Sequence, residues 1–359
     1  MRLPQKVLSL TPYAPVTEIC RIRCDANESC FPLPSALWDT AVKRMEEQAE
    51  ANRYPDPYAS ACCKAAAKKY GIHPEQVVAG NGSDELISLI ENSFLEPGGC
   101  VATIEPDFSM YGFYADLAGL RHVRIPKGED LHINPGAVTA ALEREQADLL
   151  IFSNPCNPTS LVLPAAEVER IVRSTRALVV VDEAYMEFAD ESVLGLVGEL
   201  ENLIVLKTCS KAAGLASARV GFAAGPEELI RVLYSVKSPY NVNAFSQILA
   251  QTVLEAPGYV EDCAKKLRAY TAGLYEGIRA LAADFPESVG TVYPTSTNFV
   301  YFEAKEPEKI RRALLRRSIA VRAMPGHDAP MGHLRVSTAR LEENEEVLAA
   351  LRDALKEGV

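Results

Sequence analysis

The sequence predicts an α/β fold, in which a mostly parallel mixed sheet is sandwiched by helices and a smaller α/β domain follows. Through much of the chain, short apolar segments alternate with segments of helical periodicity, a pattern typical of a sheet buried on both faces. After Pro226 the pattern changes to long helices and a second set of short strands. Because 359 residues exceed one comfortable hydrophobic core, we expect two domains.

The N-terminal segment, residues 1–34, is rich in proline and predicts an extended arm that we assign to the small domain. One short strand is expected there, over residues 19–24. The large domain is predicted over residues 35–255. Its apolar spacing predicts helices over 35–49, 58–70, 85–94, 109–118, 135–143, 164–174, 227–235 and 244–254. Short apolar runs predict strands over 77–79, 100–104, 121–125, 148–153, 177–181, 203–206 and 220–224.

The small domain is predicted over residues 256–359, hinged to the large one by a long helix over 258–282. A pattern of strand, helix, strand, strand and helix follows this hinge. The strands are expected over 298–303, 320–322 and 333–337, and the helices over 307–317 and 342–356.

Composition excludes several classes of partner. A net charge of −11 argues against a nucleic acid and against an anionic membrane surface. No apolar run approaches the roughly 20 residues that span a bilayer, and the N-terminus has no apolar signal region. The nine cysteines suggest reduced thiols, so we expect a cytoplasmic protein. No metal site is predicted, because the cluster of Cys20, Cys24 and Cys30 has no histidine near it.

Polar motifs directly follow five of the predicted strands. In open α/β sheets, ligands bind at the carboxyl ends of the strands, so these motifs are expected to form one composite site. They occupy residues 80–84, 105–108, 154–159, 182–185 and 208–211.

Two of these motifs have an evident chemistry. Lys211 beside Ser210, at the end of a buried strand, is suited to bond a carbonyl compound or to bind a phosphate, although a lone Ser-Lys is more often a surface turn. The glycines before the helix at 85–94 offer free N–H groups to a phosphate. Gly-Ser-Asp is equally an ordinary helix start, and Asp84 opposes a phosphate unless its carboxylate turns away.

Three segments in this order resemble the fold-type I pyridoxal-phosphate aminotransferases of class II, and among these the histidinol-phosphate aminotransferases. They are Asn-Pro-Cys-Asn-Pro-Thr at 154–159, Asp-Glu-Ala-Tyr at 182–185, and the stretch from Thr208 to Arg219 with its Ser-Lys pair. The resemblance covers essentially the whole chain, from residues 10–13 to residues 334–337.

The resemblance implies pyridoxal 5′-phosphate as cofactor and assigns its ring contacts. Lys211 would bond to the cofactor aldehyde and then act as general base. Asp182 would keep the ring nitrogen protonated. Tyr185 and Asn157 would hydrogen-bond the phenolic oxygen, and Phe108 would stack on the ring. Lys211, Asp182 and Tyr185 are therefore the expected catalytic residues.

The same resemblance assigns the cofactor phosphate and the oligomeric state. Arg219, Ser210 and the backbone around Gly82, Ser83 and Asp84 would hold the phosphate. In this family Tyr54 reaches the phosphate of the neighbouring subunit, which implies a homodimer with active sites at the interface.

Substrate binding is implied for two arginines and three residues of the pocket lining. Arg335 matches the family arginine that binds the anionic group of the substrate, and Arg322 is expected to be a second anion contact. Tyr13, Asn27 and Tyr240 would line the pocket. By alternation alone, Arg335 fits the solvent face of its strand equally well, because Leu334 and Val336 flank it.

The expected reaction converts L-histidinol phosphate and 2-oxoglutarate to imidazole acetol phosphate and L-glutamate, a step of histidine biosynthesis. An aromatic amino-acid aminotransferase is the nearest alternative, and a threonine-phosphate decarboxylase fits the motifs less well. A nicotinamide-dependent dehydrogenase would need a third glycine that residues 80–85 lack. A non-catalytic regulator would need a segment for DNA binding, which the chain lacks.

The sequence also departs from the family pattern. Cys156 replaces the usual asparagine and Ser160 the usual glycine of the loop that carries Asn157. Changes at 217–218 and 337–339 flank the two arginines Arg219 and Arg335. None of these positions is assigned to the cofactor, so the uncertainty they create concerns the substrate.

Overall fold

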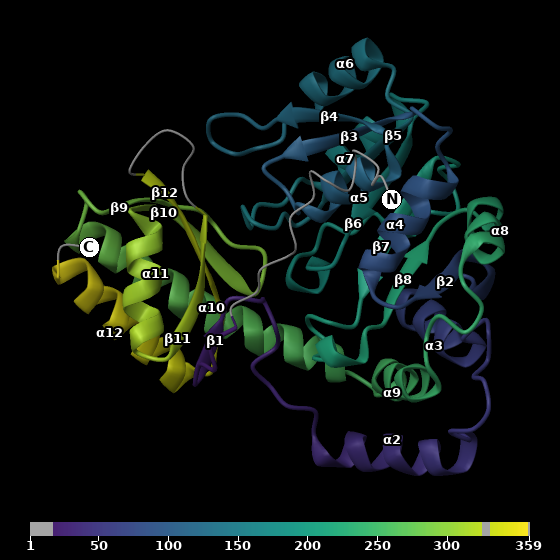
Figure 1. Cartoon of the computed structure of the whole chain (residues 1–359), viewed down its shortest axis with the longest axis horizontal. Coiled ribbons are helices and arrows are strands. Elements are labelled where there is room, and N and C mark those ends of the chain that lie inside the picture. The colour runs from purple at the N-terminus through teal and green to yellow at the C-terminus, as the bar shows by residue number, and fades with distance from the viewer. Residues whose placement is uncertain (1–16, 325–330, 358–359) are drawn as a thin grey trace, which may run out of the picture.

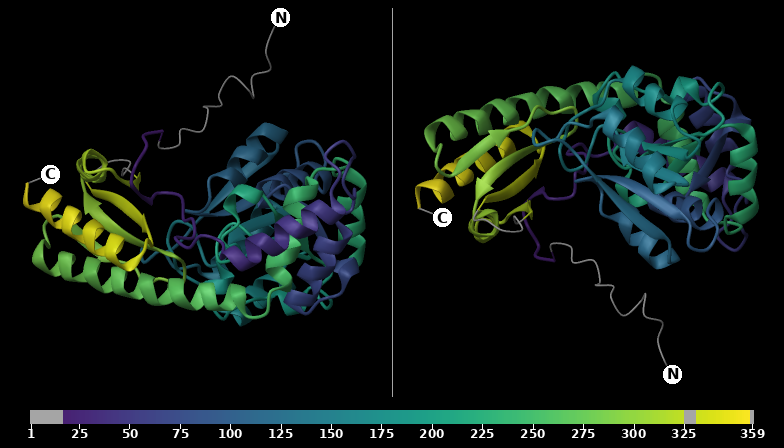
Figure 2. Two further views of the ribbon diagram at one scale, coloured as in Figure 1. Left: turned by 90° about the horizontal axis from the view of Figure 1, so that it is seen from below. Right: turned by 90° about the horizontal axis from the view of Figure 1, so that it is seen from above.

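The computed structural model describes residues 17–324 and 331–357, and Figure 1 shows two sheets side by side, each with its own helices. Tyr13 lies outside the described residues. The helix α10 (Tyr259–Asp284) contacts elements of both parts, and Figure 2 shows it extending from one to the other. The expected domain boundaries near residues 34 and 255 stay a prediction.

The larger sheet has seven strands, and only β8 runs antiparallel to its neighbours. This confirms the predicted mostly parallel mixed sheet. In spatial order the strands are β2 (Val77–Gly80), β8 (Gly221–Ala224), β7 (Leu203–Thr208), β6 (Leu178–Asp182), β5 (Leu149–Ser153), β3 (Cys100–Glu105) and β4 (Arg121–Pro126).

Helices cover both faces of this sheet. Successive side chains of a strand point to opposite faces, so one strand contributes to both layers of the core. On β6, Val180 packs with Leu86 and Ile230 on one face, whereas Val179 packs with Ile171 on the other. Each fully buried aliphatic side chain contributes about 1.5–3 kcal/mol. The helices on the first face are α4 (Ser83–Ser93), α5 (Met110–Ala118) and α8 (Glu227–Val236), and those on the second are α6 (Pro135–Glu145) and α7 (Ala165–Arg173).

A further helical layer covers the end of the large sheet near β2 and β8. Here α3 (Ser60–Tyr70) and α2 (Ser35–Gln48) both pack against α9 (Ala244–Glu255). Short 3-10 helices are found at Pro74–Gln76, Met186–Phe188, Leu194–Leu196 and Ala216–Ala218.

The smaller sheet has five strands, with α10, α11 (Pro307–Arg316) and α12 (Leu341–Lys356) packed through one apolar core. In order they are β1 (Ile22–Cys24), β11 (Ile319–Met324), β12 (Met331–Ser337), β10 (Phe299–Lys305) and β9 (Val289–Val292). The N-terminal segment therefore belongs to this sheet, because β1 pairs with β11 in parallel.

Two expectations for this region were wrong in detail. The strand expected over residues 19–24 begins only at Ile22, and Ile19 is fully exposed, at 100%. No strand was expected at β9, which is a short edge strand containing Gly290 and pairing irregularly with β10. Within the described parts of the chain, no helix is both long and apolar enough to cross a membrane.

Candidate active site

The polar motifs that follow β3, β5, β6 and β7 lie at one edge of the large sheet. These four strands are parallel, and their register places Ser153 beside Asp182, and Asp182 beside Leu206. The carboxyl ends of the strands therefore meet, as the sequence predicted.

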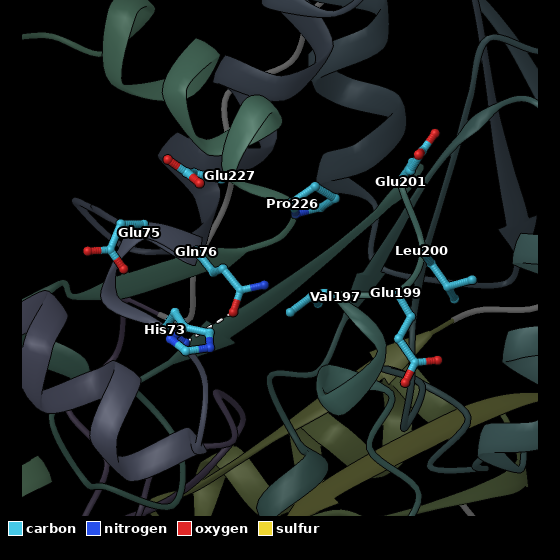
Figure 3. A pocket seen from close by; sticks show the side chains of 10 residues that line it. His73, Glu75, Gln76, Val197, Glu199, Leu200, Glu201, Pro226 and Glu227 are labelled. Atoms are coloured by element: carbon cyan, nitrogen blue, oxygen red, sulfur yellow. Dashed lines mark hydrogen bonds between the residues drawn. The ribbon is translucent and has the colours of Figure 1, made fainter.

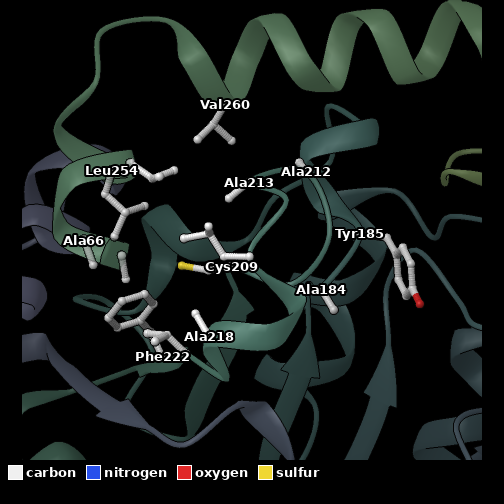
Figure 4. Close-up of a cluster of buried hydrophobic side chains, with 14 of the residues drawn as sticks. Ala66, Ala184, Tyr185, Cys209, Ala212, Ala213, Ala218, Phe222, Leu254 and Val260 are labelled. Atoms are coloured by element: carbon white, nitrogen blue, oxygen red, sulfur yellow. The ribbon is translucent and has the colours of Figure 1, made fainter. Parts of the chain in front are cut away.

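Lys211 lies in a loop of small residues that packs beneath α10. Figure 4 shows Ala212, Ala213 and Val260 in this cluster, with the ring of Tyr185 at its edge. The Lys211 Nζ donates a hydrogen bond of 3.1 Å to the carbonyl oxygen of Ala26. It also lies 5.6 Å from the centre of the Tyr185 ring. The lysine amine is thus held between the N-terminal segment and a tyrosine that follows β6.

Asp182 ends β6 and is 4% exposed. Its side chain faces the same side of the sheet as Val180, where α5 packs, so Oδ2 accepts a hydrogen bond of 2.9 Å from the hydroxyl of Tyr111. Oδ1 accepts one of 3.0 Å from the N–H of Ala184. Burial raises the pKa of Asp182 to about 6, although both donors favour the charged form. A cationic donor near this carboxylate would stabilise it.

Tyr185 is tied to the N-terminal segment through Asn27. The Asn27 side-chain amide donates a hydrogen bond of 2.9 Å to the Tyr185 hydroxyl. Asn27 has φ 55°, in the left-handed region that asparagine tolerates, and its backbone is held by Ser337 and Asn298. Asn27 was expected to line the substrate pocket, and the structure places its amide on the hydroxyl of a predicted catalytic residue.

Asn157 and Phe108 are linked through Asp107, which is buried. The Asp107 carboxylate accepts hydrogen bonds from the N–H and hydroxyl of Ser153 and, at 2.7 Å, from the N–H of Phe108. The Ser153 hydroxyl oxygen in turn accepts a bond of 3.1 Å from the N–H of Asn157. Burial raises the pKa of Asp107 to about 7, and the nearby Lys127 ammonium opposes this shift.

Lys127 joins the two loops on which Asn157 and Phe108 lie. Its Nζ donates to the carbonyl oxygen of Pro106 at 2.7 Å and to the Cys156 sulfur at 2.9 Å. Cys156, the departure from the family asparagine, is therefore a contact of a half-buried lysine. Neither Lys127 nor Asp107 was identified from the sequence as a site residue.

A phosphate-sized cradle lies at the start of α4. Gly82 precedes the helix with φ +86°, and no side chain caps the first N–H groups. A Cβ at Gly82 would lie 2.6 Å from the Arg219 Nη2, so a side chain there would push the guanidinium aside, and the positive φ also favours glycine. The Arg219 Nη1 lies 3.5 Å from the Ser210 hydroxyl. Free N–H groups, a hydroxyl and a guanidinium together suit a phosphate.

Asp84 and Ser83 form the first turn of the helix at this cradle. The Asp84 carboxylate lies 3.4 Å from the Arg219 Nη2, and both side chains are close to half exposed. The carboxylate therefore turns toward the cradle and not away from it, and it would compete with a phosphate for the Arg219 guanidinium.

Arg335 and Arg322 lie directly opposite one another on β12 and β11. Arg335 is 8% exposed, so the alternative that it faces solvent is wrong. It donates to the Asn157 side-chain oxygen and, at 2.7 Å, to the carbonyl oxygen of Asp25. Because like charges directly opposite on neighbouring strands are unfavourable, an anion between the two guanidiniums would be stabilised.

Tyr54 and Tyr240 stack on one another at the surface, with ring centres 4.5 Å apart. They are 80% and 40% exposed. The neighbouring Asn241 donates to the carbonyl oxygen of Ala79 at 3.3 Å, which ties this loop to the strand that precedes α4. The pair thus lies on the phosphate side of the site.

A pocket of about 390 Å³ lies at the opposite end of the same sheet (Figure 3). It is lined by residues that precede β2 and β7, the amino ends of these strands. Its charged groups are carboxylates, namely those of Glu75, Glu199, Glu201 and Glu227, which would repel an anionic ligand. This pocket is therefore separate from the site at the carboxyl ends.

Known proteins resemble this chain over nearly its full length. The family model "Aminotransferase class I and II" matches residues 22–351. The histidinol-phosphate aminotransferase of Thermoanaerobacter sp. (strain X514) is 35% identical over 336 residues, 93% of each chain. That of Clostridium novyi (strain NT) is 34% identical over 342 residues, 95% of this chain and 94% of the relative.

Among solved structures, the histidinol-phosphate aminotransferase of Sinorhizobium meliloti in complex with pyridoxal-5′-phosphate has a TM-score of 0.87 and 25% identity. The match covers 100% of this chain and 98% of that one. The fold that the sequence resemblance implied is thus confirmed. Because the family model spans most of the residues and both relatives exceed 30% identity, the chain belongs to the family of class I and II aminotransferases.

Proposed function

We propose that the protein is a pyridoxal-phosphate-dependent aminotransferase that transfers the amino group of L-histidinol phosphate to 2-oxoglutarate. The observation that carries this proposal is the position of Lys211 and Asp182 at one sheet edge, between the cradle of Arg219 and the two opposed arginines of the small sheet. The products would be imidazole acetol phosphate and L-glutamate, in histidine biosynthesis.

The residues at this edge fit the cofactor. When bound, pyridoxal phosphate supplies an aldehyde and an electron-accepting ring. Arg219, Ser210 and the first N–H groups of α4 would hold its phosphate, and the Asp182 carboxylate would accept a hydrogen bond from its protonated ring nitrogen. Tyr185 and Asn157 would bind the phenolic oxygen. The Lys211 Nζ would take the proton from the substrate Cα and deliver it to the former aldehyde carbon of the cofactor in the same half-reaction, and it would move a proton in the reverse direction with 2-oxoglutarate.

The arginine pair would bind the anionic part of each substrate. Both L-histidinol phosphate and 2-oxoglutarate are anions, so one pair of guanidiniums can serve donor and acceptor in turn. The names of the curated relatives favour histidinol phosphate over an aromatic amino acid or threonine phosphate as the donor.

A homodimer follows as part of the proposal. Exposed aromatic side chains of the described residues lie on α2, before α3, and both before and at the start of α9, elements that pack together. A second copy would cover them and bring its Tyr54 to the phosphate cradle. These side chains are Trp38, Tyr54, Tyr58, Tyr240 and Phe245. Sedimentation of the purified protein tests this arrangement, and a monomer at micromolar concentration would contradict it.

We also propose that the enzyme acts in the cytoplasm, since all nine of its cysteines are free, as expected in a reducing compartment.

The proposed domains are the N-terminal arm over residues 1–34, the large domain that binds pyridoxal phosphate over 35–255, and the small domain over 256–359.

A half-reaction tests the proposed donor. Mixing the enzyme with histidinol phosphate alone should move the amino group onto the cofactor, which is read as a change in the cofactor's visible absorption. Phenylalanine at the same concentration is the comparison. Efficient reaction with phenylalanine and none with histidinol phosphate would overturn the proposed donor but leave the aminotransferase reaction intact.

A further inference from the structure

Tyr111 is a buried tyrosine for which the reaction as described has no role. It lies in the first turn of α5 and is 1% exposed. Its hydroxyl donates a hydrogen bond of 2.9 Å to the Asp182 Oδ2. Burial and the neighbouring carboxylate raise the pKa of Tyr111 further above its ordinary value, so the phenol stays protonated and remains a donor.

Tyr111 also contacts Phe108, the residue expected to stack on the cofactor ring. The two rings meet edge to face, with centres 5.6 Å apart and an angle of 82°. Tyr111 thus touches two side chains that would face the cofactor from different strands: Phe108 after β3 and Asp182 at the end of β6.

We propose that Tyr111 is a positioning residue for Asp182, one whose hydroxyl orients the carboxylate toward the ring nitrogen of the cofactor and favours its charged form. The inference rests on the proposed function, because it concerns the same bound group. Two donors, the Tyr111 hydroxyl and the Ala184 N–H, each occupy one oxygen of Asp182. They fix the plane of the carboxylate and leave further lone pairs for a third donor.

The electrostatic reason is that Asp182 is buried and has Tyr111 as its side-chain donor at hydrogen-bond distance. A buried carboxylate loses its hydration, and a hydrogen bond to the charged form offsets part of that cost. Without the hydroxyl, Asp182 would be neutral more often, and a neutral acid would hold a protonated ring nitrogen less tightly.

The test measures release of two cofactors from the full-length protein. Wild type and Tyr111→Phe are loaded with pyridoxal phosphate or with 1-deazapyridoxal phosphate, whose ring has C–H in place of nitrogen. Release into an excess of scavenger is followed by absorbance. Tyr111→Phe should release pyridoxal phosphate about tenfold faster, since a hydrogen bond to a charged group is lost. Release of the deaza cofactor should be nearly unchanged, because Asp182 has no ring nitrogen to bind.

Tyr234→Phe is the matched control. The Tyr234 hydroxyl donates to the carbonyl oxygen of Val77 at 3.0 Å, within the same domain but without contact to Asp182. This variant should release both cofactors at the wild-type rate. If Tyr111→Phe does not fold, Tyr111→3-fluorotyrosine keeps the hydroxyl as a stronger donor and should slow release of pyridoxal phosphate alone.

Three outcomes decide the inference. Faster release of pyridoxal phosphate alone supports it. Equally faster release of both cofactors would show that Tyr111 only packs the site. Unchanged release of both would show that its hydroxyl is dispensable. Either result would overturn the inference. Failure of the wild type to bind pyridoxal phosphate at all would instead contradict the proposed function.

Discussion

The proposed cofactor side and the proposed substrate side of this site are built in different ways. Asp182 ends one strand of the large sheet, Lys211 follows another and Arg219 precedes a third. Asp182 and Arg219 have partners in the large domain, Tyr111 and Ser210, whereas Lys211 also donates to Ala26 of the N-terminal segment. Arg335 and Arg322 lie on the small sheet, and Arg335 bonds to Asn157 of the large-domain loop and to Asp25 of the N-terminal segment. The proposed chemistry therefore rests mainly on the large sheet and its loops, whereas the proposed selectivity depends on a junction of three chain segments.

This difference suggests which properties can change separately. A sheet buried on both faces transmits strain and tolerates little rearrangement, so residues fixed to it are suited to chemistry shared by a whole family. Residues at a junction can alter the substrate without moving the catalytic groups. The departures at Cys156 and Ser160 fall in the loop that meets the junction, where the Ser160 hydroxyl donates to the carbonyl oxygen of Pro294 at 2.9 Å.

The largest expected effect comes from Lys211→Ala. Loss of the amine removes both the bond to the cofactor and the general base, so kcat should fall by at least about a thousandfold. Borohydride should link the cofactor to Lys211 in the wild type and to no residue in the variant, as read by peptide mass. The exposed Lys309 provides a control, since Lys309→Ala should behave as wild type. A reducible adduct in the Lys211→Ala variant would refute the assignment of this lysine.

Much of the cofactor side could be predicted from the sequence, because it depends on local rules. Strands buried on both faces read as apolar runs, and each run ends where its polar motif begins. The motif at 182–185 was expected at a strand end, and β6 indeed ends at Asp182. Tyr111 was not identified, although it lies only three residues after Phe108, at the start of a predicted helix.

The contacts between loops and between the two domains were harder to predict, because they join distant segments. Asn27 and Tyr185 are 158 residues apart in the sequence, and no periodicity signals their hydrogen bond. The alternation around Arg335 could not say which face of β12 is covered, since helices bury one face and the large domain approaches the other. Lys127 and Cys156 pair between two loops, so neither residue stands out in a linear pattern.

Arg335→Lys should weaken the use of the substrate without changing cofactor binding. Lysine cannot reproduce the paired contacts to Asn157 and Asp25, so kcat/KM for the donor should fall by about a hundredfold. Cofactor release should stay at the wild-type rate. Steady-state kinetics with histidinol phosphate measure the first quantity, and Arg312→Lys on the exposed face of α11 serves as the control. A loss of cofactor binding in Arg335→Lys would contradict the separation of the two sides.

Asp107 should make the stability of the folded protein depend on pH. Its pKa is raised from 3.8 to about 7 in the folded protein, chiefly by burial. Between about pH 4 and pH 7 the folded state therefore keeps a proton that the unfolded state loses. The contribution of Asp107 to the free energy of unfolding falls progressively as the pH rises through this range.

Urea unfolding at pH 5 and pH 7 measures this effect. Between these values Asp107 should reduce the free energy of unfolding by about 2 kcal/mol, and Asp107→Asn should lose that part of the pH dependence. Asp130→Asn is a control, since Asp130 lies in an exposed turn. The same slope in wild type and Asp107→Asn would show that this carboxylate does not titrate in the window.

Arg219→Lys should have the smallest effect and should fall on the cofactor side. A lysine keeps the positive charge of the cradle but loses the planar fork that fits beside Gly82, so cofactor release should be about tenfold faster. The KM for the donor should not change, because the opposed arginines of β11 and β12 remain. Arg231→Lys, an exposed pair partner of Glu227 on α8, should leave both quantities unchanged. A higher donor KM with normal cofactor release in Arg219→Lys would reverse the roles assigned to the two sides, since it would place the substrate anion in the cradle of α4.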